Sequence, residues 1–194
     1  MKDNIYKYAM KHIAANRINH TMGVIKAAKW LAISNNLNLD ANKLETAALL
    51  HDITKHFTPK EQINLCIKYG AMSEINLDIP KTFHQVTGAI IAKYDLFIDD
   101  PDILNAIRYH TTGRENMSLY EKVIFIADFI EDGRTYEGVE EIRKAAAKGL
   151  DEVLITGFSF TIEELAKEKK EIHIDTFKAY NYYIKENNKK IGDK

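Results

Sequence analysis

Apolar side chains recur at three- and four-residue steps along almost the whole chain. This spacing puts them on one face of an α-helix. Only three prolines and nine glycines interrupt the pattern in 194 residues. The pattern predicts an all-α fold, a single-domain helical bundle. Helices are expected at residues 5–13, 17–34, 59–69, 119–131, 139–148, 151–170 and 172–186.

Two further helices end at residues that can carry chemistry. Asp40 can cap an apolar run that leads into His51-Asp52, which is expected in the last turn of that helix. Asp100 precedes a proline, and the helix that begins there should end near His110. Both ends therefore present a histidine next to apolar residues.

Other start and stop signals complete the pattern. Thr58-Pro-Lys-Glu61 and Ser118-Leu-Tyr-Glu121 have the spacing of a capping box. A helix is expected from about Lys81, after a loop at residues 71–80, and the lysine-rich tail beyond residue 186 is expected to fray. We expect a core at about residues 17–134, with C-terminal helices at 137–188 packed on it.

Composition narrows the class of protein. The formal net charge is -1 with seven histidines uncounted, so neither nucleic-acid binding nor an acidic tail is indicated. No apolar stretch is long enough to span a bilayer, and no membrane association is expected. The single cysteine, Cys66, excludes an intramolecular disulfide and is consistent with a cytoplasmic protein. The sequence leaves open whether the chain forms a homodimer.

Histidines and aspartates in or beside apolar helices are the candidate functional residues. A single histidine of this kind is more often a satisfied core or capping residue than a metal ligand. Burying several imidazoles and carboxylates together is expensive unless they share a partner, and a divalent cation is the natural one. The candidate ligands are His20, His51, Asp52, His84, His110 and Asp128.

This set is large enough for two divalent or trivalent metal ions if one carboxylate bridges them. We assign His20, His51, Asp52 and Asp128 to one metal, and Asp52 with His84 and His110 to the other. The mixture of imidazole and carboxylate argues against a thiolate zinc site and against an all-oxygen site. Iron is the expected metal, and manganese is the alternative.

Four segments resemble a known family: Arg17-Ile-Asn-His20, Ala48-Leu-Leu-His-Asp-Ile-Thr-Lys55, His110-Thr-Thr-Gly113 and Ala127-Asp-Phe-Ile-Glu-Asp-Gly-Arg134. They are similar to the HD-domain phosphohydrolases in their dinuclear form, and more narrowly to the bacterial symmetrical diadenosine tetraphosphatases. The resemblance implies an HD-type helical fold, iron, and cleavage of a dinucleoside tetraphosphate into two nucleoside diphosphates. The chain departs from that family where a proline is expected shortly before Arg134.

Two metals also predict hydrolysis of a phosphate ester or anhydride independently of the resemblance. Asp52 and Lys55 are the predicted catalytic residues, with Lys55 meeting the phosphate and the leaving group. Thr111, Thr112 and Gly113 are predicted to contact phosphate.

Arg134 is predicted to bind a terminal phosphate with both of its guanidinium donors. The alternatives are that Lys55 is a solvated surface residue, that residues 110–113 only stop a helix, and that Arg134 forms a surface ion pair.

The substrate is less well determined than the class of reaction. The first hypothesis is symmetrical cleavage of diadenosine tetraphosphate. An HD phosphohydrolase acting on a nucleoside monophosphate or triphosphate is the second, because ligands specify a reaction class better than a substrate. A nucleotide sensor without turnover and a purely structural helical protein complete the alternatives.

Overall fold

The computed structural model describes residues 2–146 and 149–192, and within them all regular secondary structure is helical. The predicted all-α fold is confirmed. The α-helices are α1 (Lys2–His12), α2 (Ile18–Ser34), α3 (Ala41–Leu50), α4 (Pro59–Lys68), α5 (Phe83–Tyr94), α6 (Pro101–Arg108), α7 (Leu119–Ile130), α8 (Val139–Ala146), α9 (Leu150–Lys167) and α10 (Ile174–Gly192).

The predicted caps start four of these helices. Thr58 and Ser118 each form a complete capping box, with Glu61 and Glu121 respectively. The Asp40 and Asp100 carboxylates accept hydrogen bonds from backbone N–H groups in the first turns of α3 and α6. Side-chain oxygens satisfy donors that the first turn of a helix leaves without partners, so these starts could be predicted locally.

The structure corrects three helix boundaries. The His51-Asp52 pair follows the end of α3 at Leu50 and lies in hydrogen-bonded turns instead of the last helical turn. The expected loop at 71–80 contains the 3-10 helix Met72–Glu74. The expected fraying after residue 186 was wrong, because α10 continues to Gly192. For the helix predicted at residues 139–148, the predicted end at Lys148 lies outside the described residues.

Ion pairs explain the extension of α10. Lys189 Nζ lies 2.6 Å from a Glu186 carboxylate oxygen one turn earlier. Lys190 Nζ lies 2.6 Å from Asp151 Oδ2 at the start of α9. Lysine stems and ion pairs of this kind add to helix stability without an apolar face, so hydrophobic spacing did not predict them.

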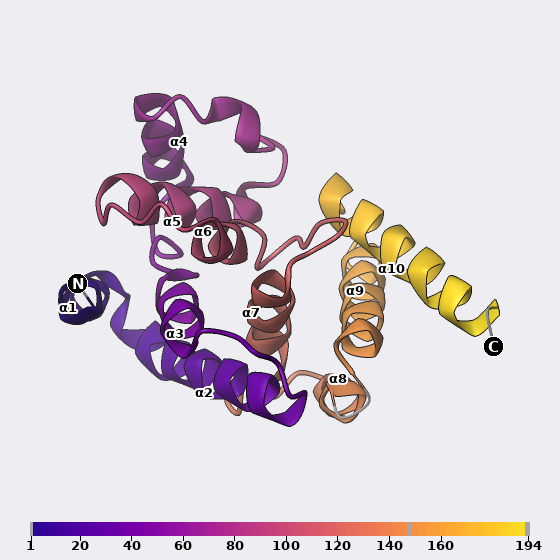
Figure 1. Ribbon diagram of the computed structural model, residues 1–194. Coiled ribbons are helices and arrows are strands. Elements are labelled where there is room, and N and C mark those ends of the chain that lie inside the picture. The colour runs from indigo at the N-terminus through magenta and orange to yellow at the C-terminus, as the bar shows by residue number, and fades with distance from the viewer. Residues whose placement is uncertain (1, 147–148, 193–194) are drawn as a thin grey trace.

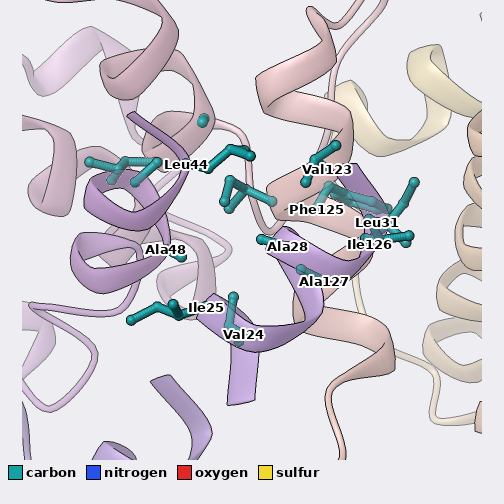
Figure 2. Close-up of a cluster of buried hydrophobic side chains, with 14 of the residues drawn as sticks. Val24, Ile25, Ala28, Leu31, Leu44, Ala48, Val123, Phe125, Ile126 and Ala127 are labelled. Atoms are coloured by element: carbon teal, nitrogen blue, oxygen red, sulfur yellow. The ribbon is translucent and has the colours of Figure 1, made fainter. Parts of the chain in front are cut away.

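Helix α7 lies between two groups of helices (Figure 1). It packs against α2, α3 and α6 on one side and against α8 and α9 on the other, and α10 covers α9. Apolar side chains of α2, α3 and α7 interdigitate to form part of one large core (Figure 2). Burial of this kind is the dominant stabilising contribution to a fold. The labelled side chains are Val24, Ile25, Ala28, Leu31, Leu44, Ala48, Val123, Phe125, Ile126 and Ala127.

A smaller apolar cluster joins α4 to α5. It contains Cys66, Ala71, Val86 and Ile90. Cys66 is fully buried and unpaired, and burial raises the pKa of its thiol to about 11. Cys66 is therefore a small core residue. Across the described residues, no helix has both the length and the apolar character that a membrane span requires.

Candidate metal centre

Five segments of the fold bring the predicted ligands to one place. The helices α2, α5 and α7 contribute one ligand each, and the segments that follow α3 and α6 contribute the others. All but two of these side chains are almost completely buried. The residues are His20 on α2, His51 and Asp52 after α3, His84 on α5, His110 after α6 and Asp128 on α7.

The ligand atoms form two groups that share one carboxylate. His20, His51 and Asp52 offer donor atoms that all lie within 4.8 Å of one another. Asp52, His84 and His110 do the same. Asp52 Oδ2 lies 3.5 Å from His51 Nε2, and its Oδ1 lies 3.3 Å from His84 Nε2. Each carboxylate oxygen of Asp52 therefore faces one group.

Backbone hydrogen bonds fix the orientation of two imidazoles. His51 Nδ1 donates to the Ala48 carbonyl at 2.6 Å, and His110 Nδ1 donates to the Ile107 carbonyl at 2.7 Å. An imidazole protonated at Nδ1 carries its lone pair at Nε2. Both lone pairs consequently point to the Asp52 carboxylate.

Burial keeps these imidazoles neutral. It lowers the pKa of His51 and His84 well below their usual range and that of His110 to about 4. His84 Nε2 lies only 3.0 Å from His110 Nε2. Neutral nitrogen donors so close together repel unless a proton or a cation lies between them.

Asp52 Oδ1 supplies a further test of whether these residues fit a metal. This oxygen is buried and has no hydrogen-bond partner among the described residues. Buried carboxylate oxygens are costly without a partner. A cation between Asp52, His84 and His110 would satisfy it, so the donor set fits a divalent metal.

Asp128 lies beside the first group and contacts an arginine. Its Oδ1 is 3.2 Å from His20 Nε2 and accepts a hydrogen bond from Arg134. Arg134 Nε also donates to the Asp128 carbonyl at 2.8 Å. Burial opposes ionisation of Asp128, but His20 and Arg134 outweigh it and hold its pKa well below the usual range. Asp128 therefore remains charged and available as a ligand.

Arg17 is a residue of the centre to which the sequence analysis assigned no role. Its guanidinium donates to Asp52 Oδ2, which puts a positive charge against the shared carboxylate. Arg17 lies three residues before His20, the spacing of neighbours on one helical face. That spacing was the signal available in the sequence.

Lys55 and Thr111 reach the second group. Lys55 Nζ lies 3.0 Å from His84 Nε2, although the residue as a whole is exposed. The Thr111 hydroxyl lies 3.0 Å from the Nε2 atoms of both His84 and His110. Both side chains therefore contact the Nε2 atoms of candidate ligands.

Thr112 and Gly113 lie away from the ligand atoms. Thr112 is 1% exposed, and its hydroxyl interacts with Gln85 and with the Gly113 carbonyl. Gly113 has a φ of 62°, and a Cβ there would lie 2.5 Å from the Phe158 ring. The structure thus brings Thr111 to the centre, while Thr112 and Gly113 shape the turn that carries it.

Four cationic side chains surround this centre. The pKa of the Lys55 ammonium is lowered to about 8, mainly by desolvation; Asp128 opposes this shift, and Arg17, Arg134 and Lys81 contribute to it. The side chains of Arg17 and Arg134 are 26% and 31% exposed. The solvent-accessible side of the centre is therefore positively charged, which favours an anionic ligand.

Arg143 fixes the loop in which the expected proline is missing. It extends from α8 and donates to the backbone carbonyls of Ile130, Glu131 and Arg134, at 3.1, 2.9 and 3.1 Å. One guanidinium thus ties both ends of residues 131–134. The loop that directs Arg134 to Asp128 is held by tertiary contacts in place of a proline.

The sequence model of the HD domain family matches residues 17–133. The chain therefore belongs to the HD domain family, which confirms the resemblance seen in the sequence. The match covers every candidate ligand from His20 to Asp128 and ends one residue before Arg134.

Individual relatives are also similar. The chain is 38% identical over 175 residues to the symmetrical bis(5'-nucleosyl)-tetraphosphatase of Bacillus subtilis strain 168, covering 90% of this chain and 92% of that protein. It is 36% identical, with the same coverage, to a protein of the same name from Halalkalibacterium halodurans. A crystal structure from Clostridium acetobutylicum, described as a predicted HD superfamily hydrolase involved in NAD metabolism, superposes with a TM-score of 0.87. It has 38% sequence identity, and the superposition covers 96% of this chain and 98% of that one.

Proposed function

We propose that the chain is a metal-dependent hydrolase that cleaves diadenosine tetraphosphate symmetrically into two ADP. The observation that carries the proposal is the pair of donor groups joined by Asp52, with Arg17, Lys55 and Arg134 around them. A substrate with four linked phosphates offers the negative charge that such a site would bind. The names of the relatives from Bacillus subtilis and Halalkalibacterium halodurans support this substrate.

Two metal ions would be held by the residues of the two groups. His20, His51, Asp52 and Asp128 would hold one, and Asp52, His84 and His110 the other. We propose iron, with manganese as the alternative, because both accept mixed imidazole and carboxylate ligands. Divalent cations in such a site acidify the attacking water and offset the charge that develops on the phosphoryl group.

In the proposed reaction a water molecule loses a proton to the solvent, and its oxygen forms a bond to one inner phosphorus atom. The bond from that phosphorus to the central bridging oxygen breaks, and the bridging oxygen leaves with the second ADP. Lys55 offers its ammonium to the negative charge on this leaving oxygen. The Thr111 hydroxyl donates a hydrogen bond to a phosphate oxygen.

The two arginines would bind the outer phosphates. Arg17 and Arg134 each donate to a carboxylate, Asp52 and Asp128 respectively. A phosphate presents paired oxygens that a guanidinium can contact with two parallel hydrogen bonds, which a lysine cannot reproduce. In this proposal Thr112 and Gly113 support the turn below the phosphates, and Thr111 makes the contact.

Product analysis tests the proposal. The protein loaded with Fe²⁺ or Mn²⁺ is incubated with diadenosine tetraphosphate, and the nucleotides are separated by chromatography. We expect ADP as the sole nucleotide product. Formation of AMP and ATP would contradict symmetrical cleavage, while leaving a metal-dependent phosphohydrolase intact.

The second candidate is a phosphohydrolase for another nucleotide. The ligands would be the same, and the difference would lie in the residues that contact the base and the outer phosphates. Faster turnover of a nucleoside monophosphate or triphosphate than of diadenosine tetraphosphate would favour it. Binding of nucleotides by the metal-loaded protein without turnover of any of them would instead favour a sensor.

A further inference from the structure

Glu131 is a buried carboxylate that the proposed reaction does not use. It follows the last residue of α7, and only 4% of it is exposed. Its Oε1 lies 3.1 Å from His20 Nδ1, and its Oε2 accepts a hydrogen bond from the Gly133 N–H at 2.7 Å. Both of its oxygens therefore have a partner.

Two glycines leave room for this carboxylate. A Cβ at Gly23, inside α2, would lie 2.4 Å from Glu131 Oε2, and a Cβ at Gly133 would lie 3.0 Å from the same atom. Glycine is less favourable than alanine inside a helix. Its presence at Gly23 is explained by the close approach of Glu131.

The contact to His20 determines which nitrogen can bind a metal. A carboxylate that accepts from Nδ1 holds the proton on that nitrogen and leaves the lone pair on Nε2. His20 Nε2 is the atom that faces His51 and Asp128. For His51 and His110 a backbone carbonyl in their own turn has this function. His20 has no such bond among the described residues, and Glu131 takes that place.

We infer that Glu131 is a positioning residue, which holds His20 in the tautomer and orientation that present Nε2 to the metal shared with His51, Asp52 and Asp128. The inference rests on the proposed two-metal hydrolase and adds a requirement to one of its two metals. Carboxylates that orient metal-binding imidazoles typically change metal affinity about 10- to 100-fold when they are removed.

Glu131→Gln tests the inference with little change in shape. A carboxylate can accept from His20 and Gly133 at once, whereas an amide has only one acceptor oxygen. The variant must either oppose the Gly133 N–H with its own NH₂ group or donate to His20 Nδ1. The second choice moves the imidazole proton to Nε2 and removes the lone pair that binds the metal.

Binding of Mn²⁺ is measured by competition with a chelator. We expect two ions in the wild type, and in Glu131→Gln an affinity about 10- to 100-fold lower for one ion only. Nitrogen NMR of histidine-labelled, metal-free protein supplies a second reading, in which the His20 signals should shift from the Nδ1-protonated pattern. This second reading does not depend on metal binding or on activity.

A pair of glycine substitutions separates positioning from folding. Gly23→Ala improves helix propensity but displaces the Glu131 carboxylate, so it should reproduce the lower affinity for one Mn²⁺ ion. Gly157→Ala in α9 is the matched control, because its Cβ would meet only Phe125, at an ordinary 3.7 Å. It should bind both ions as the wild type does.

The outcomes separate the two proposals. Wild-type protein that binds no Mn²⁺ would overturn the metal centre of the proposed function. Two ions bound equally by wild type and Glu131→Gln, with unchanged His20 signals, would overturn the positioning role alone. Equal loss of both ions in Glu131→Gln would also contradict it, because the inference assigns Glu131 to one group.

Discussion

The two ends of the candidate metal centre are built in different ways. We call His84 and His110 the inner end and His20 with Asp128 the outer end. The inner residues are 2% and 1% exposed, and His110 is oriented by a carbonyl three residues away. At the outer end the Asp128 side chain is 19% exposed, and His20 is oriented by Glu131, 111 residues away in the chain.

The two ends therefore differ in the contacts that hold their candidate ligands in place. The inner end is set largely by local turns and by burial between α5 and α6. The outer end depends on contacts between α2 and α7 and on two arginines that are partly open to solvent. We therefore expect the inner end to bind metal more tightly and the outer end to respond to substrate.

Asp52→Ala should have the largest effect, because this carboxylate belongs to both groups. We expect activity to fall more than about 1,000-fold, beyond the cost of losing one electrostatic contact in an active site. Elemental analysis should find less than one metal per chain. Asp99→Ala, at an exposed position between α5 and α6, is the control and should match the wild type. Wild-type turnover by Asp52→Ala would remove the basis of the proposed function.

Substitution of one candidate ligand at each end tests whether the inner end binds metal more tightly than the outer end. His20→Ala should keep the inner metal, whereas His110→Ala should keep at most a weakly bound outer metal. Both should lose activity about 100-fold or more, because each lacks one of the charges that stabilise the transition state. Titration with Mn²⁺ measures the remaining site. A tighter remaining site in His110→Ala than in His20→Ala would reverse the proposed order.

Lys55→Ala should affect the reaction and spare the metals. Lys55 touches His84 but donates no metal-binding atom, so both metals should remain while kcat falls about 100-fold. Steady-state kinetics with diadenosine tetraphosphate, beside elemental analysis, measure this. The exposed Lys60 on α4 offers a control, Lys60→Ala, that should change neither quantity. Loss of metal together with activity would assign Lys55 a structural role instead.

The stability of the metal-free protein should depend on pH. In metal-free protein, burial lowers the pKa of His51, His84 and His110 from the ordinary 6.5, for His110 to about 4. Below pH 6.5 the unfolded chain binds protons that the folded chain cannot. The stability present above that pH is therefore lost as the pH falls toward about 4.

Thermal unfolding in a chelating buffer measures this loss. His110→Gln should show a shallower decrease in Tm than the wild type between pH 6.5 and 4. The exposed His56 provides the control His56→Gln, whose decrease should equal that of the wild type. Equal slopes for all three proteins would contradict the assignment of buried, neutral imidazoles.

Local signals in the sequence were sufficient for most of the fold. The capping boxes at Thr58 and Ser118 and the caps at Asp40 and Asp100 lie within a few residues of the groups that they satisfy. The end of α10 was misjudged because Lys190 binds Asp151 on another helix. A contact between distant residues leaves no periodic trace in either segment.

The difference between local signals and distant contacts also applies to the candidate site. The six candidate ligands could be identified because apolar helices with embedded histidines and aspartates are unusual. Glu131 was missed because its partners, His20 and Gly23, lie more than 100 residues earlier in the chain. Thr112 was predicted to meet phosphate by its place in the chain, yet its hydroxyl faces Gln85. Direction of a side chain within a turn depends on the packing around it.

The Phe158 ring that lies against Gly113 limits how the segment with the candidate ligands could be moved to another protein. The turn after His110 is supported by α9 through this ring and by α10, where the Thr176 hydroxyl donates to the Thr112 carbonyl at 2.9 Å. The family match ends at residue 133, before both helices. A transplanted segment of residues 17–133 would carry all six ligands, but it would leave behind the support for the turn that presents Thr111.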